Sequence, residues 1–170
     1  MLRCAGFDSL DKLRATTGVR IGAQAVGHPI YAAGRLFAYV LGLKEPRMVL
    51  GYGGPELDIA LTRGEVDVRA NGADTILSRS RDAMDKGNLQ FHASISIPKG
   101  RYAAGLPKAP ELDSFTKTDK ERQLINLFRT FLYPRWPYLL PPATPKEIVA
   151  TLRGAMTKAL RDPEFHKDFK

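Results

Sequence analysis

Two hydrophobic periods alternate along the first hundred residues, and they predict strands and helices in turn. Short apolar or alternating runs predict four strands, at 19–23, 47–51, 66–70 and 89–97. Apolar residues spaced three and four apart predict a short helix at 9–13 and longer helices at 29–43, 55–63 and 73–85. Because the three longer helices connect the four strands, the pattern predicts a parallel, right-handed α/β sheet.

The pattern changes after Pro98. Residues 98–117 are rich in proline, glycine and lysine, which predicts a surface loop. A helix is predicted over 118–132, and the prolines that follow it exclude a central strand. Thr144 and Glu147 have the spacing of a capping box, which predicts the start of a C-terminal helix. We therefore expect an α/β lobe over 1–97, a loop over 98–117, and a C-terminal part of helices and a proline-rich crossing segment over 118–170.

Composition excludes several classes of function. The 170 residues are 44% hydrophobic and 26% charged, which predicts one compact domain or slightly more. The net charge is +8, but the basic residues are scattered and not interleaved with aromatic residues. We therefore expect attraction of anionic solutes and no nucleic-acid binding. The single cysteine, Cys4, excludes an internal disulfide bond, and the three histidines have no metal-site spacing, so neither a metal nor another cofactor is expected.

Targeting signals are not visible in the sequence. No stretch approaches the roughly 20 apolar residues that cross a bilayer. The first residues lack the apolar core of a signal peptide. If the chain is the full natural product, we expect it to be cytoplasmic; otherwise a signal lies upstream.

The most informative segment runs from Leu50 to Asp67 and joins a strand end, a Gly-Tyr-Gly-Gly turn, a helix and the next strand. Glycines leave backbone N–H groups exposed at the helix start, where the helix dipole favours an anion. The same pattern is typical of an ordinary turn between a strand and a helix, so both interpretations stay open. The sequence has no Gly-x-Ser-x-Gly elbow, phosphate-binding loop or recognisable carboxylate pair, so we predict no catalytic residues and no enzyme.

Three motifs follow one another along the chain. A strand leads through Gly22 and Gly27 into a helix, and residues 51–56 open a helix that ends in the Arg-Gly-Glu-Val-Asp of 63–67. The third motif, within 141–165, combines Pro-Pro-x-x-Pro with a closing Arg-Asp-Pro-Glu-Phe. As a set, over nearly the whole chain, these motifs resemble the periplasmic solute receptors of tripartite tricarboxylate transporters, the Bug-type binding proteins.

The resemblance implies a fold and a function. The fold would be α/β, the parallel-sheet lobe of a type II periplasmic binding protein with C-terminal helices. The function would be capture of a small organic carboxylate, without chemistry, in the periplasm, for the membrane components of a tripartite tricarboxylate transporter. Family members are longer, and nothing in this chain matches their signal peptide and N-terminal lobe. The chain would then be the second lobe with its C-terminal helices, either a natural truncation or a piece of a larger receptor.

Two other functions stay open. A truncated relic that no longer binds a ligand would serve as a dimeric or partner-binding module. A small nucleotide-binding or enzymatic α/β domain would need motifs that are missing. In the family, the segment from Trp136 to Pro142 and the closing helices pack on the lobe that is missing here. The residues left to find cover are Trp136, Tyr138, Leu139 and the apolar face of the helix from Pro145 to Leu160. Without that lobe we expect a homodimer, with exchange of the C-terminal helices as one form of it.

The turn after the first strand is the first candidate site. The resemblance implies that this turn offers backbone amides and short polar side chains to a ligand carboxylate. The turn begins at Ala23; Gln24 and His28 would supply side-chain donors, and Val26 and Gly27 would supply backbone donors at a helix start. The alternative is that the glycines only make a tight turn.

Two further turns are expected at the same edge of the sheet. Tyr52, between glycines at a strand end, would present its hydroxyl group there with Gly53 and Gly54, or would simply cover the end of the sheet. Glu56 is expected to support the helix dipole rather than contact an anionic ligand. Asn71, after the third strand, would donate to a ligand or cap the next helix.

Overall fold

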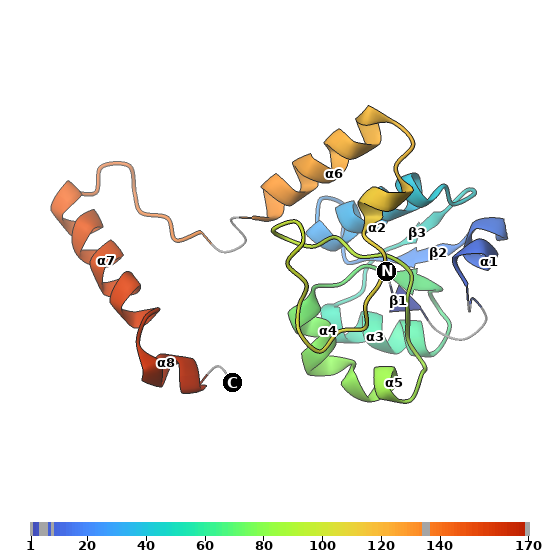
Figure 1. The fold of residues 1–170 in the computed structure, drawn as a ribbon, viewed down its shortest axis with the longest axis horizontal. Helices are drawn as coiled ribbons and strands as arrows, with labels where there is room; N and C mark the ends of the chain where they lie inside the picture. Colours follow the sequence, from blue (N-terminus) through green and yellow to red (C-terminus); the bar gives the residue numbers. More distant parts are fainter. Residues whose placement is uncertain (1, 4–6, 8, 134–136, 169–170) are drawn as a thin grey trace. The chain divides into compact units, whose positions relative to one another are not determined.

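A mixed β-sheet with helices on both faces is the framework of the first part of the chain (Figure 1). The computed structural model describes residues 2–3, 7, 9–133 and 137–168. The chain divides into two units, Met1–Arg135 and Trp136–Lys170. The sheet and its helices belong to the first unit.

The order of the strands across the sheet is β3-β2-β4-β1-β5. β2 pairs in parallel with β3 and β4, whereas β1 runs antiparallel to β4 and β5. The α/β fold and the parallel pairing of its first three predicted strands are therefore confirmed. The strands are β1 (Leu2–Arg3), β2 (Arg20–Gly22), β3 (Arg47–Val49), β4 (Val68–Arg69) and β5 (Gln90–Phe91).

The prediction of a wholly parallel sheet is wrong because β1 lies between β4 and β5 in the opposite direction. A strand of two residues is too short to show an alternating pattern, and its place is fixed only by pairing with distant residues. The end of the sheet at which β2, β3 and β4 finish is called the carboxyl edge here, and the opposite end the amino edge. Because β1 is antiparallel, its first residue lies at the carboxyl edge.

Helices cover both faces of this sheet (Figure 1). α2 and α6 lie on one face, and α3, α4 and α5 lie on the other. A single turn of 3₁₀-helix, η1, packs against α2 and α6. The helices of the first unit are α1 (Leu10–Ala15), α2 (Pro29–Leu41), α3 (Gly54–Thr62), α4 (Ala73–Arg79), α5 (Arg81–Asp85), η1 (Leu112–Phe115) and α6 (Asp119–Leu132).

Three predicted elements differ in extent. The helix expected over 73–85 divides at Ser80, whose φ of −118° leaves the helical region. The strand expected over 89–97 ends at Phe91, because the backbone N–H groups of Ser94 and Ser96 turn toward residues 110–111. The loop expected over 98–117 is not wholly at the surface, since η1 buries Leu112 completely.

Two hydrophobic clusters fill the two faces of the sheet. The cluster under α2 and α6 includes Leu13, Ile21, Phe37, Leu41, Val68, Leu112 and Ile125. The cluster under α3 and α4 includes Leu57, Ala60, Leu61, Val66 and Ile76. Since both faces are covered, the central strands are buried on both sides, as parallel strands generally are.

Gly22, at the end of β2, is closely covered by side chains of α3 and of the segment before β4. A Cβ atom at this position would overlap Leu57 Cδ1 and lie 3.1 Å from Val66 Cγ2. Any larger residue would therefore require the Leu57 side chain, or α3 with it, to shift. Gly22 is needed for packing as well as for the turn that follows it.

A buried ionic network holds the segment that follows β5. The Arg129 guanidinium of α6 donates to Glu111 Oε2 at 3.0 Å, to both carboxylate oxygens of Asp113 and to the Ser96 carbonyl at 3.1 Å. Lys99 adds an ion pair to Asp113 at 2.9 Å. The hydrogen bonds from Arg129 and Lys99 lower the pKa of Asp113 from 3.8 to about 2.

The second unit contains two helices with exposed apolar side chains. α7 (Lys146–Ala159) is followed by α8 (Pro163–Asp168), and no described side chain of α7 is buried. The predicted capping box is wrong: Pro145 is the N-cap of α7, and the Thr144 hydroxyl group instead donates to the Pro141 carbonyl at 2.7 Å. Trp136, which the dimer prediction invokes, lies outside the described residues.

Replacement of Gly22 by alanine is expected to destabilise the first unit by about 1–3 kcal/mol, because the added methyl group overlaps Leu57. Urea unfolding measures this change. G154A is the matched control, since a Cβ at Gly154 in α7 meets nothing within 4 Å. G154A should raise helix content and leave unfolding of the first unit unchanged. Equal stabilities of G22A and the parent chain would contradict the packing argument.

Acid should weaken the Arg129 network. Since the folded pKa of Asp113 lies below its ordinary value, its stabilisation is complete above about pH 4 and is lost as the pH falls toward 2. D113N should therefore cost about 2 kcal/mol at pH 7. This difference from the parent chain should shrink below pH 4 in urea unfolding. A difference that stays constant down to pH 2 would contradict the assigned pKa.

The homodimer stays a prediction, and the second unit supplies a reason for it. Tyr138 and Leu139 are 80% and 84% exposed, and Ile148 and Leu152 of α7 are about half exposed. Apolar surface of this kind tends to associate. Sedimentation at rising concentration should show a dimer, which the double substitution I148Q/L152Q should weaken. A parent chain that stays monomeric throughout would rule the prediction out.

Candidate functional site

The turns that follow β2 and β3 lie side by side at the carboxyl edge, because these strands are parallel neighbours. Two backbone hydrogen bonds join the turns: Ala23 N–H donates to the Val49 carbonyl, and Gly51 N–H donates to the Gln24 carbonyl, each at 2.9 Å. β4 finishes at the same edge, so the turn that follows it starts there too. The sequence prediction that these turns share one edge is confirmed.

The turn after β2 carries a row of backbone donors. His28 N–H donates to the Ala25 carbonyl at 3.2 Å, and Gly27 has a φ of +84°. These two features define a type II turn. The N–H groups of Gln24, Ala25, Val26 and Gly27 make no hydrogen bond within the part of the chain that the structure describes. Val26 is 72% exposed, so solvent reaches this row.

The first turn of α2 continues the row. His28 is the N-cap of α2, and its Nδ1 accepts a hydrogen bond from Ile30 N–H at 3.2 Å. Pro29 has no N–H group, and the Tyr31 N–H group has no acceptor among the residues described. Only Nε2 of His28 is thus left to meet a ligand. Ala23 has no backbone donor to offer, because its N–H group is bonded within the sheet and the residue is completely buried.

The partial positive charge at the start of α3 is already neutralised by the carboxylate of Glu56, in the first turn of the same helix. Gly53 is the N-cap of α3, and its N–H group donates to Glu56 Oε2 at 2.7 Å. The expectation that Glu56 supports the helix dipole is confirmed. Gly53 therefore does not present its amide to an anion, and a carboxylate stands where an anion would bind.

Tyr52 points away from the carboxyl edge. Its ring packs against the cluster under α3, and its hydroxyl group donates to Glu65 Oε2 at 3.3 Å. Glu65 lies between the end of α3 and the start of β4, which is the amino edge. Burial raises the pKa of Tyr52, and the Glu65 carboxylate raises it further. The hydroxyl group is therefore not presented to the edge where the sequence placed it.

Asn71 has one polar atom engaged and one without a partner. Its Oδ1 accepts from Gly72 N–H at 2.9 Å, while its buried Nδ2 has no acceptor among the residues that the structure describes. The N-cap of α4 is Gly72, so Asn71 does not cap that helix. A donor without a partner is left at the end of β4.

Three charged residues that the sequence did not identify as candidates form a cluster near the start of α3. Arg69, only 2% exposed in β4, pairs with Asp58 of α3 and donates to the Gly54 carbonyl at 3.4 Å. Arg79 of α4 contacts the other oxygen of Asp58 at 3.2 Å. Burial lowers the pKa of Arg69, and the charge of Asp58 opposes this shift. The sequence carries one signal for this cluster. Arg69 stands inside a strand that is buried on both faces, and a buried arginine requires an acidic partner.

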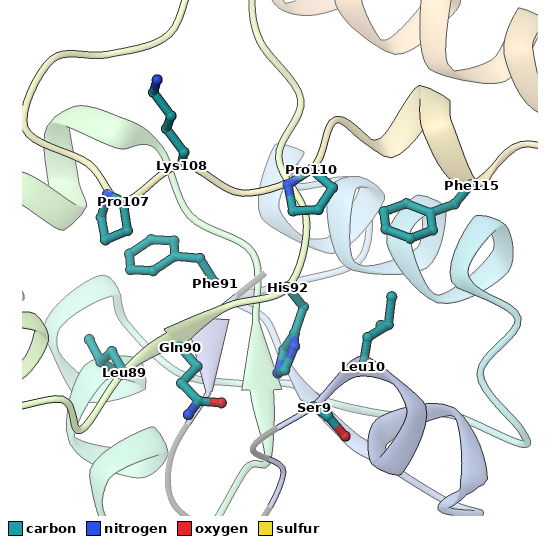
Figure 2. Close-up of a pocket in the computed structure, with 10 residues that line it drawn as sticks. All are labelled: Ser9, Leu10, Leu89, Gln90, Phe91, His92, Pro107, Lys108, Pro110 and Phe115. Carbon is teal, nitrogen blue, oxygen red and sulfur yellow. The ribbon is translucent and has the colours of Figure 1, made fainter.

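A cavity of about 570 Å³ lies beside β5, away from these turns (Figure 2). Its wall includes the rings of Phe91, Pro110 and Phe115, and the buried His92 ring points between Gln90 and Leu10. None of the predicted site residues lines it. Among the residues described, no group of His, Cys, Asp and Glu side chains could hold a metal ion.

The sequence was compared with models of known families and with curated proteins, and neither comparison gives a match. No helix in the described ranges is long and apolar enough to span a membrane. The family resemblance rests on the motifs alone.

Removal of the Arg69 charge tests how much the ion pair between Arg69 and Asp58 contributes to stability. R69M loses the bonds to Gly54 and Asp58, and should cost about 2–4 kcal/mol in urea unfolding. Arg63 is the control, since its side chain is 71% exposed and R63M should change stability by less than about 0.5 kcal/mol. Equal effects of the two substitutions would show that the buried pair contributes nothing.

Proposed function

We propose that this chain is a ligand-binding lobe of a solute receptor, and that it holds one carboxylate of a small organic acid against the turn after β2. The observation that carries the proposal is the row of N–H groups at Gln24–Gly27 and Tyr31 without partners among the described residues. Several converging amides at the start of a helix bind an anion through hydrogen bonds and the helix dipole.

The contrast between two helices that are successive in the chain supports this choice of site. α2 is 13 residues long and has no acidic residue in its first turn, whereas α3 has Glu56 bonded to its N-cap amide. An anion is therefore attracted to α2 and repelled from α3. The ligand carboxylate is assigned to Gln24–Gly27, with His28 Nε2 as an adjacent donor.

The direction of β1 supports a two-lobed receptor. β1 is antiparallel to its neighbours, so the chain enters the sheet from the carboxyl edge. This is the same edge of the sheet at which β2 ends and the turn after β2 begins. The periplasm and the membrane components of a tripartite tricarboxylate transporter are the location and partners that fit such a receptor.

A non-binding interaction module is the second candidate. The observation that favours it is the exposed apolar surface of Tyr138, Leu139 and α7. Under this alternative the lobe keeps its fold, the dimer carries the function, and no carboxylate binds.

A substitution in the turn separates the two candidates. Proline suits the position of Val26 in a type II turn and removes its N–H group, while V26A keeps that group. One lobe makes contacts from one side only, so succinate should bind the parent chain with a Kd of about 1 mM or weaker. V26P should weaken this binding several-fold, and V26A should leave it unchanged.

Calorimetry at high protein concentration measures these affinities. A micromolar Kd would contradict the one-sided site and favour a self-sufficient binding domain. No saturable binding by the parent chain, or equal binding by V26P and V26A, would contradict the assignment of the carboxylate to this turn.

A further inference from the structure

Asn71 and Gly72 form the one Asn-Gly pair in the sequence, and they join β4 to α4. The other two asparagines, Asn88 and Asn126, each precede a leucine. An asparagine amide is chemically labile, because the backbone nitrogen of the next residue can attack its Cγ atom. Glycine leaves that nitrogen unshielded, since it has no side chain. The sequence therefore singles out one asparagine for this reaction.

The folded chain leaves the attacking nitrogen uncommitted. Gly72 N–H donates at 2.9 Å to Oδ1 of Asn71 itself, and to no other acceptor among the residues described. The last residue of β4 is Arg69 and the first of α4 is Ala73, so neither element includes this N–H group in its own hydrogen bonds. The nitrogen of Gly72 and the side-chain amide of Asn71 therefore already lie against each other.

The leaving group is not held by a hydrogen bond. Because a backbone N–H group can only donate, the atom of Asn71 that faces Gly72 is the carbonyl oxygen, and the remaining atom is the amino nitrogen Nδ2. Nδ2 is buried and has no acceptor in the described part of the chain. A buried donor without a partner is unfavourable. Loss of Nδ2 as ammonia would therefore break no hydrogen bond and would remove an unfavourable group.

The other two asparagines are more protected. Asn126 Oδ1 accepts from Arg129 Nη1 at 3.3 Å, and the next residue, Leu127, lies inside α6, where the helix uses its backbone N–H group. Asn88 is exposed, but the side chain of Leu89 that follows it packs against the cluster under α3 and α4. Both asparagines are thus internal references for Asn71.

We propose that Asn71 is a deamidation site of the folded protein. Gly72 N–H loses its proton to hydroxide, and the nitrogen forms a bond to Asn71 Cγ. The bond between Cγ and Nδ2 breaks, Nδ2 takes up a proton from water and leaves as ammonia, and a succinimide ring remains. Water then opens the ring at either carbonyl group, which gives aspartate or isoaspartate at position 71. An amide is exchanged for a carboxylic acid, and nothing is oxidised or reduced.

The product changes the carboxyl edge, at which β4 finishes. Both products add a negative charge to an edge that carries exposed N–H donors, so the edge attracts anions less strongly after the reaction. Isoaspartate also takes the backbone through the side-chain carbon, which lengthens the connection between β4 and α4.

Mass spectrometry of tryptic peptides measures the reaction in the full chain. Cleavage after arginine and lysine gives the peptides 70–79, 87–99 and 123–129, each with a single asparagine. After incubation of the folded chain in mildly alkaline buffer, the peptide 70–79 should gain the mass difference between an amide and an acid. It should also separate into an aspartate form and an isoaspartate form. The other two peptides should keep their amides.

A matched pair of variants tests the role of Gly72. The φ of Gly72 is −74°, which alanine also adopts, so G72A should fold. Its added methyl group shields the nitrogen, and G72A should keep the Asn71 amide over the time in which the parent chain loses it. G154A is the control, since a Cβ at Gly154 meets nothing within 4 Å, and it should react like the parent chain.

Three results would overturn the proposal. An Asn71 amide that survives in the folded parent chain and is lost only in urea would show that folding protects it. Equal loss from the three peptides would show that Asn71 is not selected. Equal loss from G72A and the parent chain would exclude attack by an unshielded Gly72 nitrogen.

Discussion

The parallel pairing of β2 with β3 and β4 is the constraint on which the rest of the arrangement depends. β2 lies between β3 and β4, and its last residue, Gly22, pairs with Val49 on one side and Arg69 on the other. This register brings three strand ends to one edge, and the absence of a side chain at Gly22 lets α3 pack closely against them. The spacing of the turns at the carboxyl edge is thus set by packing in the core.

Electrostatics then distinguishes two helix starts that look alike in the backbone. α2 meets solvent with a row of N–H groups and an imidazole, while α3 has its own carboxylate and lies above Arg69, Arg79 and Asp58. Amides favour an anion only where no internal anion already occupies them. Among the residues described, the fold leaves the donors at the start of α2 open and the Gly53 amide at the start of α3 closed, and the partly exposed Arg79 lies against the start of α3.

Much of the fold could be predicted from local patterns, and most of what was missed depends on distant contacts. The helices and the parallel strands follow hydrophobic periods that a single segment shows by itself. β1 has two residues, and its place depends on pairing with β4 and β5. The direction of Tyr52 depends on Glu65, and the burial of Arg69 depends on Asp58. For the candidate site, the sequence located the turns. It could not show which of their N–H and O–H groups already donate to other residues of the chain.

The most direct test of the account is an amide-resolved NMR titration of the chain with succinate. The account predicts that the largest shifts fall on the N–H groups of Gln24–Gly27 and Tyr31, with little change at Gly53, whose amide is held by Glu56. Shifts concentrated on Gly53, on the cavity beside β5, or spread evenly over the surface would contradict the claim that the turn after β2 is the anion site.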